Sequence, residues 1–466
     1  KPRLGPVTAD HPHPTPTTHF APAESSPASS RSSAFRQEQT MTIYRGTFLD
    51  CPEDPFTGGS LRSLTDGAIV VADGRIVARG PWAELASHPD AGEVVDLRGG
   101  VVVPGMVDTH VHYPQVRVIG GLGMPLLDWL DRRALPEECH LADAAYAAEI
   151  AGEFVGSMLR AGTTSALVFG SHFAVAMDAF FAEAERSGLR VASGLVVSDS
   201  ALPEPLLTTP ERSIEEAIAL AERWHCGGNG RLRYAVTPRF SFSCSDALLG
   251  ACAEARAAVP GSLFTSHVNE NHAEIAGVEA AFGRSYVDTY DVHGLLDRTS
   301  VLAHNVHPQD AELDVLAARG STIAHCPCSN SALGSGMFPL ARHLAHGVGI
   351  ALGTDVGGGV SFSLLREGLQ AAFMQQLMGD AGYALGPAHL LWLATAAGAR
   401  ALGLDAVGHL SVGMQFDAVW LRPEAGSTLD IGLRHAADDA DAVAKLFALG
   451  GTADVAGVWV GGDHLR

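Results

Sequence analysis

The chain has 466 residues, of which 47% are hydrophobic and 18% are charged, as in a large folded domain that carries a smaller module. Its formal net charge of −21 opposes binding to phosphate backbones and anionic lipids, which excludes nucleic acid and membrane surfaces as partners and favours a small molecule. No apolar run approaches the roughly 18 residues that a membrane-spanning helix needs.

The first 40 residues differ in composition from the rest of the chain. They are rich in Pro, Ser, Thr and Ala, and they lack both hydrophobic periodicity and the apolar core of a secretion signal. Met41 follows directly and opens the first strand-like run. We therefore expect residues 1–40 to be a disordered extension or a segment added for expression.

Both ends of the remaining chain are rich in β-strand signals. Residues 41–106 contain short β-rich runs with turns, and Asp73-Gly74 is a hairpin signal within them. Residues 403–466 repeat this character. The strand-like runs are 43–48, 67–77, 94–103, 416–421 and 456–461. The pattern predicts one small β-sandwich domain built from both chain ends.

The middle of the chain, residues 107–402, alternates strand and helix patterns. Apolar runs that end in polar residues occur at 101–112, 163–172, 190–199, 232–241, 262–270, 299–305, 321–326 and 348–355. Amphipathic, Ala-rich stretches lie between them, such as 142–160, 214–224, 246–258 and 308–319. These alternations predict an α/β fold, a (β/α)8 TIM-type barrel, whose chemistry should lie at the C-terminal ends of the strands.

Histidines and one acid fall at those strand ends. His110 and His112 are two residues apart on the first strand and so face the same side. The fifth strand ends at His267, the sixth at His304 and the eighth at Asp355. Imidazoles with a carboxylate suit Zn²⁺ or Fe²⁺, so we predict a metal site. The histidines expected to be structural are His140, His172, His225, His293, His307 and His325, of which His172 and His325 also end strands and are further candidates for a pocket wall.

The stretch Pro104-Gly105-Met106-Val107-Asp108-Thr109-His110-Val111-His112, together with His267, His304 and Asp355, resembles the metal motif of the amidohydrolase superfamily. The resemblance extends from Met41 to the C-terminus. Many members bridge two metals with a carboxylated lysine, but the only lysines here, Lys1 and Lys445, lie outside the predicted barrel. A binuclear site is thereby excluded, and a mononuclear, deaminase-like site remains.

Within the superfamily, five local motifs resemble those of the guanine deaminases. They are Leu127-Asp128-Trp129-Leu130, Thr237-Pro238-Arg239-Phe240-Ser241, His267-Val268-Asn269-Glu270, Ala324-His325-Cys326-Pro327 and Gly353-Thr354-Asp355-Val356-Gly357-Gly358. The segment Asp131-Arg132-Arg133-Ala134-Leu135-Pro136 departs from that family, which usually has an aromatic before Thr-Phe-Pro. The departure affects how a lid over the pocket would pack.

The resemblance implies zinc-dependent hydrolytic deamination of guanine to xanthine and ammonia, in purine catabolism or salvage. One Zn²⁺ per chain, with Fe²⁺ as the alternative, would be held by His110, His112, His267 and Asp355. A metal lowers the pKa of a bound water to about 7. Asp355 would take the proton of that water, and the adjacent His304 would hydrogen-bond the attacking oxygen. Glu270 would carry a proton to N3 of the base.

The resemblance also implies how the substrate is recognised. Gln115 and Arg239 match the positions that hydrogen-bond the C6 carbonyl, and Phe240 matches one that lines the base site. A homodimer is implied as well. Two alternatives stay open: a related deaminase or chlorohydrolase acting on another heterocycle, such as 8-oxoguanine or a triazine, and a non-catalytic binding scaffold. Arg239-Phe240 argues against the first, and the complete set of metal ligands with Glu270 argues against the second.

The cysteines indicate a compartment rather than a second metal site. Seven cysteines are an odd number without a dense disulfide pattern, which favours a reducing, cytoplasmic location. Cys326 and Cys328 flank Pro327, but no other cysteine pair lies nearby, and a zinc site normally needs four ligands.

A chain that begins at Met41 should fold and work like the full chain, because residues 1–40 lack the periodicity of a packed segment. Thermal unfolding and enzymatic turnover of the two chains, measured side by side, test this. Loss of cooperative unfolding in the shortened chain would show that the first 40 residues belong to the fold.

Overall fold

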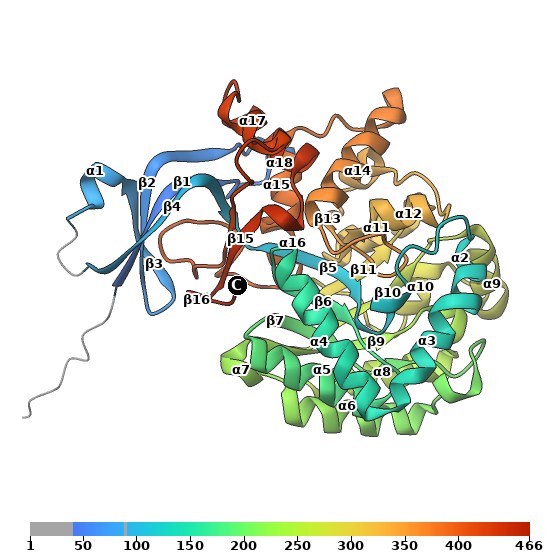
Figure 1. Cartoon of the computed structure of the whole chain (residues 1–466). Coiled ribbons are helices and arrows are strands. Elements are labelled where there is room, and N and C mark those ends of the chain that lie inside the picture. The colour runs from blue at the N-terminus through green and yellow to red at the C-terminus, as the bar shows by residue number, and fades with distance from the viewer. Residues whose placement is uncertain (1–40, 88–90) are drawn as a thin grey trace, which may run out of the picture. The chain divides into compact units, whose positions relative to one another are not determined.

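A parallel sheet that curves into a nearly closed barrel is the centre of this computed structural model, which describes residues 41–87 and 91–466 (Figure 1). Its strands pair in the order β13-β12-β11-β10-β9-β7-β6-β5, and short β8 (Val196–Val197) pairs with β9. The bounds are β5 Met106–His112, β6 Thr163–Phe169, β7 Arg190–Gly194, β9 Leu232–Pro238, β10 Leu263–Val268, β11 Ser300–His304, β12 Thr322–His325 and β13 Gly349–Leu352. The prediction for residues 1–40 lies outside the described residues.

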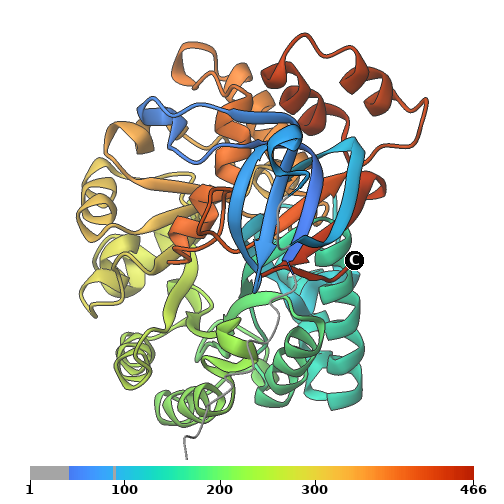
Figure 2. The same cartoon turned by 90° about the vertical axis from the view of Figure 1, so that its left-hand side faces the viewer.

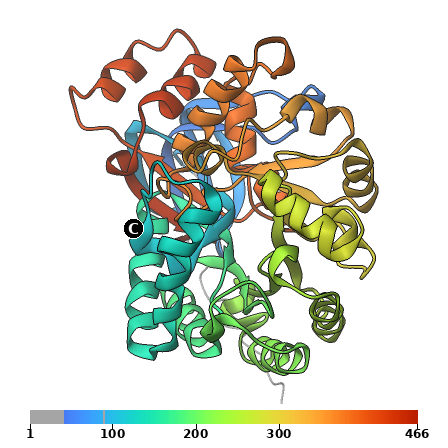
Figure 3. The same ribbon diagram turned by 90° about the vertical axis from the view of Figure 1, so that its right-hand side faces the viewer.

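Helices cover the outside of these strands (Figure 3). They include α4 Ala144–Arg160, α5 Ala174–Ser187, α6 Pro210–Trp224, α8 Asp246–Ala258, α9 His272–Phe282, α11 Asp310–Arg319 and α14 Leu364–Leu377. In α4, Asp143 caps the first turn, and Ile150, Phe154 and Met158 recur at helical spacing on the buried face. The predicted (β/α)8 barrel is confirmed. No helix among the described residues is long and apolar enough to cross a membrane.

Hydrogen bonds at the end of β13 and just beyond it close the barrel against β5. The Thr109 hydroxyl donates to the Leu352 carbonyl at 2.8 Å. The Asp355 amide donates to the His110 carbonyl at 2.8 Å, and the His112 amide donates to the Val356 carbonyl at 2.7 Å. The segment after β13 therefore returns to the two histidines of β5.

The two chain ends meet in a second, seven-stranded sheet with the order β16-β15-β14-β4-β1-β2-β3 (Figure 2). Its strands are β1 Met41–Asp50, β2 Arg62–Ala72, β3 Arg75–Pro81, β4 Ala91–Pro104, β14 Ala418–Leu421, β15 Val455–Val460 and β16 Asp463–His464. N- and C-terminal strands join where β4 pairs antiparallel with β14. The prediction that both ends build one additional β-module is confirmed, whereas the boundaries at 106/107 and 402/403 stay predictions.

The predicted hairpin lies between β2 and β3. Its two central residues, Asp73 and Gly74, have φ values of 50° and 74°. Positive φ at both positions is what a tight hairpin turn with the twist of its strands requires, and aspartate and glycine tolerate it.

The apolar run 101–112 forms two strands in two sheets instead of the single strand predicted. Residues up to Pro104 belong to β4, and β5 begins at Met106. A side chain on Gly105 would place its Cβ 2.1 Å from the Thr164 hydroxyl oxygen. The chain therefore changes sheets at a position where only glycine fits.

Two helices interrupt the β-rich C-terminal segment, which the sequence pattern did not predict. α17 (Thr428–Arg434) and α18 (Asp439–Leu449) separate β14 from β15. The side chains of Ser427 and Asp438 cap their first turns. α18 buries Val443, Leu446 and Phe447.

Candidate metal centre and substrate pocket

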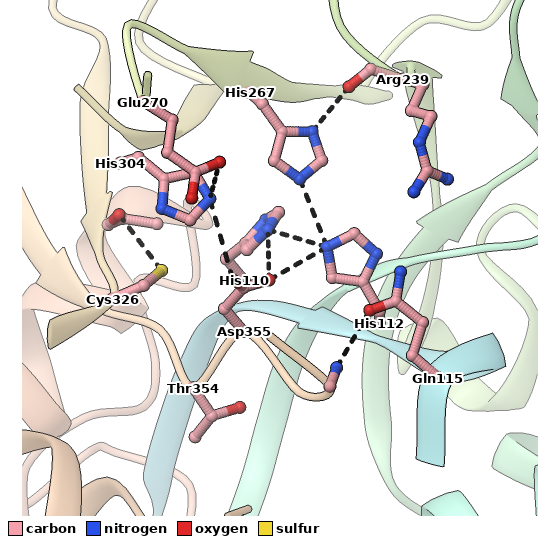
Figure 4. Close-up of polar contacts among 12 residues, drawn as sticks. His110, His112, Gln115, Arg239, His267, Glu270, His304, Cys326, Thr354 and Asp355 are labelled. Carbon is pink, nitrogen blue, oxygen red and sulfur yellow. Dashed lines mark hydrogen bonds and ion pairs between the residues drawn. The ribbon is translucent and has the colours of Figure 1, made fainter. Parts of the chain in front are cut away.

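Four buried side chains converge at the C-terminal mouth of the barrel (Figure 4). Their ligand atoms all lie within 4.8 Å of one another, and they belong to His110, His112, His267 and Asp355. Nε2 of His112 lies 3.1 Å from Nε2 of His110 and 3.3 Å from Nε2 of His267. Oδ1 of Asp355 lies 3.2 Å from His110 Nε2 and 3.1 Å from His112 Nε2.

This arrangement fits a divalent metal ion. Bonds of about 2.0–2.1 Å in a tetrahedral site put neighbouring ligand atoms about 3.4 Å apart, close to the separations found here. Nδ1 of His267 lies 2.6 Å from the Arg239 carbonyl oxygen. A neutral imidazole that donates from Nδ1 directs the lone pair of Nε2 toward the other three ligand atoms. Three nitrogens and one carboxylate oxygen suit zinc-like cations better than Ca²⁺ or Mg²⁺.

Burial keeps the imidazoles in the form that binds metal. It lowers the pKa of His112 to about 4 and lowers the pKa values of His110 and His267 as well. Burial raises the pKa of Asp355, but hydrogen bonds from His110 and His112 outweigh it and leave this pKa well below its ordinary value. The cluster therefore holds neutral imidazoles and an ionised carboxylate.

His304 lies beside the metal cluster rather than within it. Its Nδ1 is 3.0 Å from the Asn330 side-chain oxygen, and its Nε2 is 3.3 Å from Glu270 Oε2 and 3.8 Å from Asp355 Oδ2. His304 and Asp355 have φ values of 73° and 47°. Such left-handed backbone costs about 1–3 kcal/mol at a residue other than glycine, and it is found most often where a side chain is held for function.

Glu270 is a buried acid held from two sides. Its Oε1 accepts a hydrogen bond of 2.8 Å from the Ser335 hydroxyl, and its Oε2 faces His304. Burial, followed by the charge of Asp355, raises the pKa of Glu270 to about 8, although the Ser335 hydrogen bond lowers it. Glu270 therefore holds a proton at neutral pH while its position stays fixed.

A pocket lies over the cluster, and its walls are largely apolar. It is lined by His112, Gln115, Leu126, Trp129, Leu130, Arg239, Phe240, His267, Glu270, Glu274, His304, Leu333 and Asp355. Leu126, Trp129 and Leu130 come from the segment directly before the stretch Asp131–Pro136, and they pack with Leu333. Small-molecule sites commonly combine such apolar walls with a few fixed polar groups.

Gln115 and Arg239 supply N–H groups to this pocket. Both are buried, and Figure 4 shows them on the His112 side of the cluster. The Gln115 amide nitrogen and Arg239 Nη1 donate to the two carboxylate oxygens of Glu138, at 2.8 and 2.6 Å. The pocket thus has acids at one end and N–H donors at the other.

The other histidines and cysteines singled out from the sequence lie outside this pocket. The side chains of His172 and His325 are buried but do not line it; His325 stacks on Phe338, with ring centroids 4.2 Å apart. Cys326 and Cys328 are free and buried, and neither belongs to the metal cluster found among the described residues.

Three buried polar residues of the site were not predicted. Asp108 accepts hydrogen bonds from the amides of His110 and Thr354, at 3.2 and 3.0 Å, and so ties β5 to the Asp355 segment. Ser335 fixes Glu270, and Glu138 joins Gln115 to Arg239. A signal existed only for Glu138, since it falls at helical spacing between the apolar Leu135 and Leu141.

Comparison with known proteins gives matches along nearly the whole described chain. The model of the amidohydrolase family matches residues 101–465, and that of a bacterial imidazolonepropionase-like composite domain matches residues 67–91. A probable guanine deaminase of Deinococcus radiodurans is 61% identical over an alignment of 432 residues, and the alignment covers 91% of this chain and 98% of the relative.

Two solved structures show the same architecture. E. coli guanine deaminase has a TM-score of 0.87 at 34% identity and covers 91% of this chain and 99% of its own. A guanine deaminase from C. acetobutylicum, with guanine bound in its active site, has a TM-score of 0.84 at 26% identity and covers 92% and 100%. Together with the family match across the barrel, these likenesses show that the chain belongs to the amidohydrolase family.

Proposed function

We propose that this chain is a guanine deaminase, which hydrolyses guanine to xanthine and ammonia. The observation that carries the proposal is the pairing, in one pocket, of a His₃Asp metal cluster with buried N–H donors from Gln115 and Arg239. The relatives that are 61% and 34% identical bear the names probable guanine deaminase and guanine deaminase, which supports the same substrate here.

The donor end of the pocket is suited to the C6 carbonyl of guanine. Arg239 and Gln115 each donate a hydrogen bond to Glu138, and each has further N–H groups that can donate to a ligand. A buried donor left without an acceptor costs about 1–3 kcal/mol, so bases that lack this carbonyl are disfavoured. Phe240, which lines the pocket, offers an apolar surface to the base.

The acid end is suited to proton transfer. Glu270 holds a proton and would give it to N3 of guanine, which makes C2 more electrophilic. A water oxygen then bonds to C2 while Asp355 accepts the proton of that water and His304 hydrogen-bonds its oxygen. Transfer of the proton from Asp355 to the exocyclic amine would then break the C2–N bond and release ammonia. The C2 hydroxyl would return its proton to Glu270 as the C2 carbonyl of xanthine forms.

The four-residue cluster would hold one divalent cation, and we propose Zn²⁺, with Fe²⁺ as the alternative. Such a cation, when bound, lowers the pKa of water and so supplies a nucleophile at neutral pH. We propose one ion per chain because a second ion would need a carboxylated lysine to bridge it to the first, and residues 107–402 contain no lysine. The homodimer and the cytoplasmic location stay predictions; that all seven cysteines are free supports the latter.

Purified protein should contain about one zinc or iron per chain, and His110→Ala should lose it, because one of four ligands is removed. Elemental analysis of metal per chain is the measurement. His293→Ala is the matched control, since His293 bonds Asp246 outside the pocket and its loss should leave the metal content unchanged. Two tightly held ions per active chain, or full metal content in His110→Ala, would contradict the assignment.

Glu270→Gln should keep the metal and lose about 10²–10⁴-fold in kcat, because an amide keeps the shape and the Ser335 contact but cannot deliver a proton. Steady-state turnover together with metal content separates the two effects. Glu279→Gln, on an exposed part of α9, is the control and should retain wild-type turnover. Near-normal turnover of Glu270→Gln would remove Glu270 from the mechanism.

The substrate assignment is tested by incubating the metal-loaded protein with guanine and following loss of the guanine absorbance and release of ammonia. Parallel reactions with 8-oxoguanine and with amino- and chlorotriazines cover the related activities. We expect the highest kcat/KM with guanine. A higher value with a triazine would replace the assignment, and absence of turnover on every compound would favour a binding scaffold.

A further inference from the structure

Glu138 is a buried carboxylate beside the pocket that has no part in the chemistry proposed above. It belongs to the short helix α3 (Leu135–Cys139), is 2% exposed, and does not line the pocket. Its Oε1 accepts from the Gln115 amide nitrogen at 2.8 Å, and its Oε2 accepts from Arg239 Nη1 at 2.6 Å. Glu138 thus contacts both residues proposed to hydrogen-bond the C6 carbonyl oxygen, Gln115 and Arg239.

The contacts of Gln115 fix which end of its amide faces which partner. Its side-chain oxygen accepts from the Gly357 amide at 3.0 Å, while its nitrogen donates to Glu138. Rotating the amide by half a turn would place an oxygen against a carboxylate and an NH₂ group against an N–H. Both contacts would be repulsive, so Gln115 is held as a donor.

The ionisation of Glu138 strengthens this arrangement. Burial is the largest single influence and raises its pKa. The charge of Arg239, followed by His172, whose Nε2 lies 3.6 Å away, and by the hydrogen bonds from Gln115 and Arg239, together outweigh burial. The resulting pKa lies below the ordinary value for glutamate. An ionised carboxylate accepts hydrogen bonds and donates none, so Gln115 and Arg239 can only turn N–H groups toward it.

We propose that Glu138 is a positioning residue that makes this end of the pocket donor-only, and thereby sets the preference for a 6-oxo over a 6-amino purine. The inference rests on the proposed function. A carbonyl oxygen at C6 accepts from Gln115 and Arg239. An amino group at C6 instead turns its own hydrogens toward those donors, and both sides remain unpaired.

Glu138→Gln tests this role on two substrates with the same leaving group, guanine and 2,6-diaminopurine. Gln115 and Arg239 donate to different oxygens of Glu138, and in the introduced amide an NH₂ group replaces one of these oxygens. At their present positions only one of the two donors then faces an acceptor, and the other is displaced or turned around. In the full-length, metal-loaded enzyme we expect kcat/KM for guanine to fall about 10- to 100-fold. The value of kcat/KM for 2,6-diaminopurine should change by less than about threefold. The preference for guanine, measured as the ratio of the two kcat/KM values, should therefore decrease.

Glu137→Gln is the matched control. Glu137 is the adjacent residue of α3 and accepts a hydrogen bond of 2.6 Å from the Tyr146 hydroxyl, away from the pocket. We expect both efficiencies of this variant to stay within about twofold of wild type, a change too small to count as an effect on recognition. Metal content and the thermal midpoint of each variant show whether the fold is retained.

If Glu138→Gln folds poorly, the double variant Gln115→Glu with Glu138→Gln still tests the role of Glu138. The carboxylate then stands at position 115, where it accepts from the Gly357 amide and from the amide introduced at 138, whose oxygen accepts from Arg239. Every hydrogen bond and the total charge are kept. An acceptor now faces the pocket, so the preference should shift further toward 2,6-diaminopurine.

The possible outcomes distinguish a failure of the role proposed for Glu138 from a failure of the proposed guanine deaminase activity. Wild-type protein that releases ammonia from neither purine overturns the proposed function. Wild-type protein that prefers guanine, with a ratio of kcat/KM values that is unchanged in Glu138→Gln and in the double variant, overturns the inference alone. Equal loss on both substrates in Glu138→Gln would also overturn it, because Glu138 would then only support the fold.

Discussion

Four ligand atoms from three separate segments must meet in one small volume, and the mouth of the barrel is organised around that requirement. β5 alone supplies two of them, because alternate residues of a strand face the same side. The carboxylate comes from the segment after β13, which reaches β5 only because the barrel closes there. Asp108 accepts from the amides of His110 and Thr354, so the same residue supports barrel closure and ligand placement. A change that opens this seam would therefore disturb the fold and the metal site together.

Much of the fold could be predicted from the sequence, because parallel strands and amphipathic helices leave different hydrophobic periods. Two features could not. The apolar run through Gly105 is continuous, and hydrophobicity does not tell which of two sheets a buried residue joins. The close approach of Thr164 to Gly105, where the chain changes sheets, is visible only in the structure. Helices α17 and α18 were missed because the strands on either side, β14 and β15, gave the whole C-terminal segment a β-rich appearance.

The site was predictable where chemistry depends on residues that a strand end places directly. The His-x-His pair on β5, His267 near the end of β10 and His304 at the end of β11 are of this kind. The supporting groups were harder to predict, because a hydroxyl such as that of Ser335 gains its role from a partner 65 residues away. Glu138 could be predicted in part. An acid on an apolar helical face is visible in the sequence, but the two partners of that acid are not.

Arg239 serves the two halves of the site through different atoms. Its main-chain carbonyl orients His267, a proposed metal ligand, whereas its guanidinium belongs to the donor end of the pocket. Any amino acid at this position has the main-chain carbonyl that contacts His267. The side chain can therefore be exchanged while this hydrogen bond is kept. Recognition can in this way diverge while the hydrolytic machinery is inherited intact. A replacement of the side chain at position 239, directly after β9 (Leu232–Pro238), would therefore alter the donor end of the pocket and leave the backbone contact to His267 in place.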